Sequence, residues 1–105
     1  MYQLGDYTIR EIRLYPKAFM IDAIHSDESS SILYEKDVTV LYEEVAAIEY
    51  NFKPRNLTDL CTVVFMLRNH VSYQFGFEYT SPVSARLGEV LSIVQGRDHS
   101  IKMER

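Results

Sequence analysis

The side chains that most often bind metals or carry out catalysis are few in this chain, and they lie far apart. The three histidines, His25, His70 and His99, fall in separate polar segments, and none has a second histidine three or four positions away. Cys61 is the single cysteine, so neither a paired-cysteine zinc motif nor a disulfide within the chain can form. The sequence therefore predicts no metal site.

Nucleophiles and phosphate-binding loops also lack their usual context. Cys61 lies in the apolar, strand-like run Leu60–Val64, which favours a buried and inert thiol over a nucleophile. No serine has the flanking residues of a nucleophile elbow. The four glycines, at positions 5, 76, 88 and 96, are not grouped, so the chain has no glycine-rich phosphate loop.

Two groups of carboxylates could still do chemistry. Glu43 and Glu44 could act as an acid and a base, but neighbours on a strand point to opposite faces and share a site only if the backbone kinks. In the polar stretch His25–Ser31, Asp27 and Glu28 could hold a cation, although the composition favours a solvated loop. We therefore expect a protein that is not an enzyme and needs no cofactor.

The segment best suited to binding is Tyr50–Leu57, which has the densest positive charge of an otherwise acidic chain. Because aromatic residues and arginine dominate binding hot spots, we predict a binding site here. Its residues are Tyr50, Phe52, Lys53, Arg55 and Leu57. In the alternative interpretation, Phe52 and Leu57 anchor the ends of a loop in the core, and Lys53 and Arg55 are merely solvated.

These residues belong to a chain with room for one domain. Its 105 residues are enough for a single core, and residues 97–105 form a polar tail that we expect to be frayed. A net charge of −4 argues against a surface selected for duplex nucleic acid or anionic lipid. The start of the sequence lacks a signal-peptide pattern, and no apolar run approaches the roughly 18 residues of a membrane span. We expect no membrane span and a cytoplasmic location.

The first part of the chain predicts two antiparallel strands, at 7–15 and 18–24, separated by Pro16-Lys17. Phe19, Ile21 and Ala23 alternate cleanly in the second strand. In the first strand, Ile9 is out of phase with the later apolar residues, which indicates a bulge or a short helical turn.

After the polar stretch, residues 32–35 and 38–42 predict a hairpin that turns at Lys36-Asp37. Its first strand would place the apolar run Ile32–Tyr34 at the edge of the sheet, where it invites pairing with a second copy. Glu35 and Lys36 offer some protection against such pairing. We therefore expect a monomer or a weak homodimer.

Residues 42–52 fit two structures. Ile48, Tyr50 and Phe52 alternate as in a strand, whereas Val45, Ile48 and Phe52 also have the spacing of a helix face. We favour a tight turn at Glu43-Glu44 followed by a strand, because aromatic residues and asparagine are concentrated after position 48. The helix remains the alternative.

The second half of the chain contains the clearest strands. Residues 52–59 predict a loop, and residues 62–68 are apolar on both faces, as in a central strand. A turn at 68–70 leads to a strand over 72–80. This strand has Tyr73, Phe75, Phe77 and Tyr79 on one face.

The last predicted element is an amphipathic helix over 82–95. Ser81 is its expected N-cap, Pro82 occupies the first helical position, and Gly96 is the expected left-handed stop. One apolar stripe runs along it, formed by Val83, Leu87, Val90, Leu91 and Val94. This stripe must be buried, and the aromatic face of the preceding strand is its expected partner.

The order of these elements resembles a pleckstrin-homology-like domain of the small bacterial kind. The resemblance rests on the segment 42–48, the paired strands 62–68 and 72–80, and the helix 82–95. It implies an α+β, mainly β fold. In that fold, a strongly bent antiparallel sheet or partly open barrel of six to seven strands is closed by one C-terminal amphipathic helix. The basic cluster of lipid-binding members is reduced here to Arg10, Arg13 and Lys17, interrupted by Glu11, and the helix lacks tryptophan. Binding of lipid headgroups therefore does not follow from the resemblance.

Three functions remain open at this point. The first is a non-catalytic module that recognises another protein through a sheet edge or the 50–57 loop. The second is a small acidic inhibitor or immunity-type protein, from a bacterium or phage, that blocks a basic nuclease or nucleic-acid-binding enzyme. The third is a single-strand nucleic-acid binder, which requires exposed aromatic residues for stacking.

Overall fold

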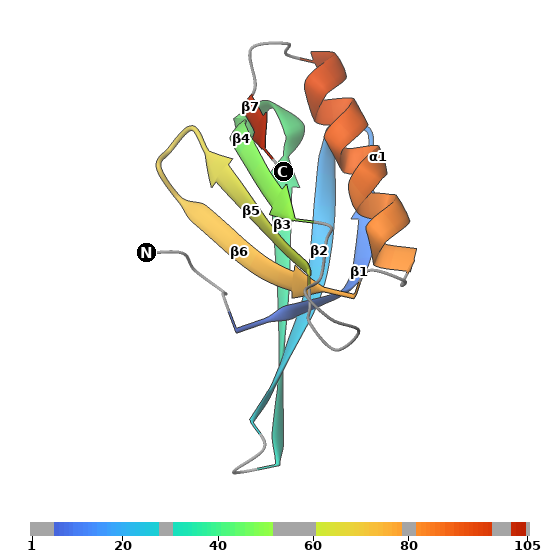
Figure 1. Ribbon diagram of the computed structural model, residues 1–105, viewed down its shortest axis with the longest axis vertical. Coiled ribbons are helices and arrows are strands. Elements are labelled where there is room, and N and C mark those ends of the chain that lie inside the picture. Colours follow the sequence, from blue (N-terminus) through green and yellow to red (C-terminus); the bar gives the residue numbers. More distant parts are fainter. Residues whose placement is uncertain (1–5, 28–30, 52–60, 79–81, 98–101, 105) are drawn as a thin grey trace.

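The computed structural model describes residues 6–27, 31–51, 61–78, 82–97 and 102–104. They form one seven-stranded sheet and one long helix, which lies against the sheet near β1 (Figure 1). The elements in chain order are β1 (Thr8–Leu14), β2 (Ala18–Asp27), β3 (Ile32–Leu41), the 3₁₀ turn η1 (Tyr42–Glu44), β4 (Val45–Asn51), β5 (Cys61–Leu67), β6 (Ser72–Phe77), α1 (Pro82–Arg97) and β7 (Lys102–Glu104).

The sheet is built from two antiparallel meanders that meet at their first and last strands. The strand order is β3-β2-β1-β6-β5-β4-β7. The meanders β1–β3 and β4–β6 are antiparallel throughout, whereas β1 joins β6 in parallel at the single pair Thr8–Gly76, and β7 joins β4 in parallel. The sheet is therefore mixed and open, and the expectation of a wholly antiparallel sheet is wrong at these two junctions. The mainly β architecture with one C-terminal helix is confirmed.

The predicted irregularity in the first strand is a bulge. The pairing of β1 with β2 shifts between Ile9 and Glu11. This extra residue lets Ile9 and Ile12 both reach the core, although their spacing does not fit a regular strand. A second shift, between Val45 and Ala47 in β4, buries Val45 and Ile48 in the same way. The apparent helical spacing of this segment thus belongs to a bulged strand, and the predicted turn and strand are confirmed.

The predicted hairpin across Lys36-Asp37 is wrong. β3 runs without interruption from Ile32 to Leu41, and each of its residues has a partner in β2. His25, Ser26 and Asp27 likewise belong to β2 and not to a loop. Lys36 and Asp37 fit within a strand because β3 lies at the edge of the sheet, where charged side chains stay in solvent.

The apolar stripe of the helix is confirmed, but its end and its neighbours differ from the prediction. Its stripe residues are all buried in one core with Phe65 and Phe75, yet the helix backbone lies closest to β1 and η1, not to β6. Gly96 is helical and no described glycine has a positive φ, so it is not a left-handed stop. The helix continues to Arg97, which donates a hydrogen bond to the Pro16 carbonyl (3.0 Å) and stacks on the Tyr42 ring. The tail is also more ordered than expected, because residues 102–104 form β7.

Candidate functional site

The free edge of β3, meaning the side of Ile32–Leu41 that faces away from β2, ends the sheet. The Tyr42 N–H donates to the Lys17 carbonyl at 3.0 Å, and the β2–β3 register is regular from that point. Hydrogen bonding alternates along an antiparallel pair, so the even-numbered residues of β3 bond to β2. The odd-numbered residues therefore present their N–H and C=O groups to the free edge. These residues are Leu33, Glu35, Asp37, Thr39 and Leu41.

Among the described residues, this edge also carries most of the large hydrophobic side chains that are exposed. Of the five exposed large hydrophobic side chains among the described residues, four lie on β3: Ile32 (46%), Leu33 (55%), Tyr34 (42%) and Leu41 (37%). Val38 and Val40, further along the strand, enter the core. The β2–β3 hairpin thus extends past the core and projects from the rest of the molecule (Figure 1). It presents both apolar side chains and backbone hydrogen-bonding groups.

Aromatic contacts hold the projecting hairpin in place. His25 stacks on Tyr34 across the ladder, with ring centroids 5.9 Å apart, and Tyr7 contacts the same imidazole at 5.6 Å. The His25 Nδ1 lies 3.1 Å from the Asp6 carbonyl oxygen, which can only accept, so this nitrogen is the donor. His25 is thereby placed as a structural residue of the hairpin. In the cation site considered for the sequence, Glu28 and the side chain of Asp27 lie outside the described residues.

A charged group crosses the outer face of the first meander. Arg10 is the bulged residue of β1, and its guanidinium binds Asp22 on β2 (Nη2–Oδ2 2.8 Å, Nε–Oδ2 3.0 Å) and Glu35 on β3 (3.1 Å). The hydrogen bond to Asp22, followed by that to Glu35, raises the pKa of Arg10. Asp37 lies directly opposite Asp22 in the ladder. Three carboxylates, those of Asp22, Glu35 and Asp37, therefore lie on this face, and the Arg10 guanidinium pairs with the first two.

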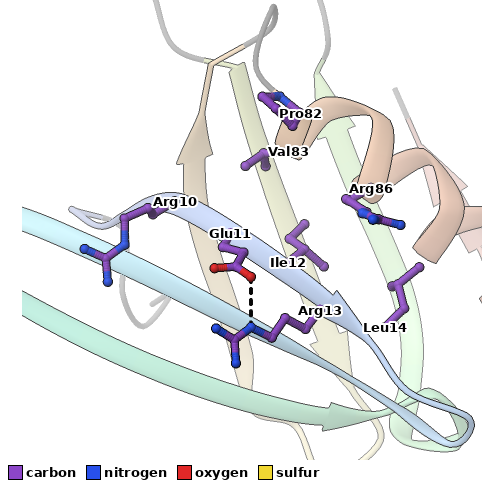
Figure 2. Close-up of a pocket in the computed structure, with 8 residues that line it drawn as sticks. All are labelled: Arg10, Glu11, Ile12, Arg13, Leu14, Pro82, Val83 and Arg86. Carbon is purple, nitrogen blue, oxygen red and sulfur yellow. Dashed lines mark hydrogen bonds and ion pairs between the residues drawn. The ribbon is translucent and has the colours of Figure 1, made fainter.

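A pocket of about 420 Å³ lies between β1 and the first turn of α1 (Figure 2). Ile12 and Val83 line it, and beyond Thr8 no described strand pairs with β1 on this side. Its arginines do not converge on a ligand. Arg13 is bound to Glu11 (2.8 Å) and Arg86 is bound to Glu89 (3.0 Å), while Arg10 points away from the helix (Figure 2).

The predicted binding segment is only partly described. Tyr50 is half-buried in β4 and packs against the core, as an anchoring residue would. Phe52, Lys53, Arg55 and Leu57 lie outside the described residues, so the choice between a binding loop and a structural loop stays open. The structure does bring Tyr50 into one sheet with β3, but on the opposite meander.

The other chemical candidates have structural places. Cys61 is buried, and this burial raises the pKa of its thiol, as expected for an inert side chain. Glu43 and Glu44 form the 3₁₀ turn, and the carbonyl of Glu43 accepts a hydrogen bond from Arg68 Nε (3.0 Å). His70 takes a positive φ of 70° in the turn after β5. Within the described ranges, no group of three or more histidine, cysteine, aspartate or glutamate side chains is placed to hold a metal ion.

The Arg10–Asp22–Glu35 group and the continuous β3 strand were not predicted from the sequence. The available signal was the phase slip at Ile9, because a bulge there turns Arg10 across the sheet. The apolar run Ile32–Tyr34 was correctly predicted as an edge.

Comparison with models of protein families, with curated proteins and with solved structures found no match for this chain. In the described part of the chain, no helix is both long and apolar enough to cross a membrane. In the part of the chain that the structure describes, the molecule is a mainly β domain whose longest unpaired strand edge is that of β3.

Proposed function

We propose that this chain is a non-catalytic binding module that accepts an extended segment of another protein as an additional strand on the free edge of β3. The observation that carries the proposal is the combination of unpaired backbone groups and exposed apolar side chains on one ten-residue strand. In strand addition, main-chain hydrogen bonds supply affinity, and pockets or patches for alternate side chains supply specificity. The free edge of β3 offers both.

Two further features support protein binding over the alternatives. The aromatic residues of β6 do not offer a stacking platform for single-stranded nucleic acid, because Phe75 and Phe77 are fully buried and Tyr73 packs against the core. The arginines around the pocket beside α1 are already paired with carboxylates: Arg13 and Arg86 with a carboxylate of their own element, and Arg10 with carboxylates of β2 and β3.

The proposed relation to pleckstrin-homology-like domains is supported by the layout. Two antiparallel meanders meet at β1 and β6, and the C-terminal helix follows the second meander directly. The proposal includes a cytoplasmic place of action, in line with a chain that has one buried cysteine and needs no disulfide.

Thr39→Pro tests strand addition directly. Thr39 is exposed, and its N–H points to the free edge. Proline at this position therefore removes a hydrogen-bond donor that β3 would offer to a bound strand, but it leaves the ladder with β2 intact. Thr39→Val is the matched control because it keeps the N–H and the β-branched shape.

The measurement is affinity for the partner captured from the native cell, together with amide exchange of β3. We expect the partner to protect the odd-numbered amides of β3 in the wild-type protein and in Thr39→Val. We expect Thr39→Pro to lose at least tenfold in affinity, since it loses a backbone hydrogen bond and clashes with the added strand. Equal affinity of all three proteins, with no protection of β3, would exclude this edge as the binding site.

A further inference from the structure

The outer face of the β3 edge, opposite the core, has an unbalanced negative charge. Glu35 and Asp37 are two positions apart and therefore lie on the same face, together with Asp22 on β2. Arg10 binds Asp22 and Glu35, but Asp37 makes no ion pair with any described residue and faces Asp22 across the ladder. Like charges directly opposite one another in a sheet are unfavourable. A cation arriving on the free side of β3 would relieve this contact.

A second copy of the chain cannot supply that cation at the right place. Two copies that extend the sheet through a two-fold axis place odd residues opposite odd residues. With the axis at Lys36, Glu35 of each copy faces Asp37 of the other, and the two Lys36 side chains face each other. With the axis at Glu35 or Asp37, that carboxylate faces its own copy. The registers centred on Glu35, Lys36 or Asp37 thus all juxtapose like charges.

The remaining registers shorten the interface. An axis at Val38 avoids the like-charge pairs but leaves the exposed residues Ile32–Tyr34 outside the interface. An axis at Tyr34 pairs only Ile32–Lys36 of each strand. The charges at the centre of β3 therefore oppose self-association, in the way that charged residues protect natural edge strands.

An added antiparallel strand of a different sequence meets no such conflict. Lys or Arg at two alternate positions would face Asp37 and Glu35 on the outer face. The position between them would face Lys36 and must not be cationic. Further along, alternate apolar residues would face Tyr34 and Ile32 on the core side.

We infer that the occupant of the free edge of β3 is a basic extended segment of another protein. It reads, from its N-terminus, as cationic, non-cationic, cationic, apolar, any residue, apolar. The inference rests on the proposed strand addition and names the chemistry of the partner. It also assigns Glu35 and Asp37 as residues that determine specificity, with the exposed apolar residues as the anchor.

Two synthetic peptides test the charge assignment on the full chain. One contains Lys-Thr-Lys-Val-Thr-Val and the other Glu-Thr-Glu-Val-Thr-Val, with identical neutral flanks and one fluorescent label. Fluorescence anisotropy at low and high salt gives their affinities. We expect the wild-type protein to prefer the lysine peptide by on the order of tenfold at low salt, and we expect salt to reduce this preference.

Charge reversals on β3 and on the helix provide the matched comparison. Asp37→Lys should remove most of the preference, and Glu35→Lys/Asp37→Lys should invert it. Glu89→Lys makes the same change in net charge as Asp37→Lys, but on an exposed position of the helix, and should leave the preference unchanged. A preference that falls equally in Asp37→Lys and Glu89→Lys reports only net charge and overturns the inference.

The outcomes separate this inference from the proposed function. Equal affinities for both peptides, lost in Thr39→Pro, would keep strand addition and overturn the basic partner. No binding of the lysine peptide at about 1 mM, an affinity weaker than about −4 kcal/mol, would also overturn it. A dimer in sedimentation, together with protection of the β3 amides from exchange, would assign the edge to a second copy instead. The proposed function itself is tested by the native partner and Thr39→Pro.

Discussion

The two edges of the sheet are treated in opposite ways. At one end, the chain covers β4 with its own short strand β7, which pairs only with Ala47–Glu49. At the other end, β3 is ten residues long, projects past the core (Figure 1) and, among the described strands, has a neighbour only on its β2 side. Short or covered edges prevent unwanted pairing, whereas a long open edge is a template for another strand. Under the proposed function, β3 is the edge that this domain presents to a partner, and β4 is the edge that β7 covers.

Both edges belong to one sheet that is packed on one core. The largest effect on stability should therefore come from the helix that completes this core. Leu87→Ala removes a fully buried side chain and should lower the free energy of unfolding by about 2–4 kcal/mol. Both edges should then lose order together. Chemical denaturation followed by circular dichroism measures this loss, with the exposed Ser92→Ala as control. A loss below about 0.5 kcal/mol would contradict the packed helix.

Removal of β7 should convert the protected edge into an open one. A chain that stops after residue 101 loses the backbone bonds to Ala47–Glu49, which should reduce stability by about 1–2 kcal/mol. Hydrogen exchange should speed up at β4 and stay unchanged at β3. If β4 exchanges at the same rate in both proteins, β7 does not protect this edge.

Reducing the apolar character of the open edge should have a smaller effect on stability. Leu33 is 55% exposed, so Leu33→Lys should change the free energy of unfolding by no more than about 0.5 kcal/mol. The added charge should suppress any weak self-association at high concentration, as measured by light scattering. Unchanged self-association would show that copies meet elsewhere on the molecule.

The smallest effect is expected for the loop that the sequence alone favoured. Lys53→Glu/Arg55→Glu should leave the melting temperature nearly unchanged, because the sequence predicts solvated charges at these positions and such charges contribute little to stability. If β3 is the binding edge, this variant should also retain affinity for the partner captured from cells. Loss of binding here, with Thr39→Pro still active, would move the interface from β3 to the 50–57 loop.

The elements defined by local apolar patterns were predictable, and the ones defined by distant pairing were not. The stripe on α1 and the phase slip at Ile9 can be read from neighbouring residues, so both predictions are confirmed. Lys36-Asp37 has the composition of a turn, and only its pairing with Ala23 and Asp22 keeps it in a strand. Gly96 has the right type for a helix stop, but the bond from Arg97 to the Pro16 carbonyl extends the helix past it.

The candidate site was predictable only in part for the same reason. The exposed run Ile32–Tyr34 has an edge-like composition that the sequence shows directly. The charge pattern around it joins Arg10, Asp22 and Glu35 from three strands, and it exists only once the register is known. The same register also determines that the odd-numbered residues of β3 present their backbone N–H and C=O groups to the free edge.

The junction of the two meanders has a consequence for folding. β1 and β6 come from distant parts of the chain and meet only at Thr8–Gly76, supported by the Gly76 N–H bonded to the Tyr7 carbonyl (2.9 Å). Within each meander, neighbouring strands are close in sequence, so their ladders close short loops at low entropic cost. We therefore expect each meander to assemble as its own cooperative unit. The helix α1, which contacts β1 and shares one core with Phe65 and Phe75 of the second meander, should join the two in the last step.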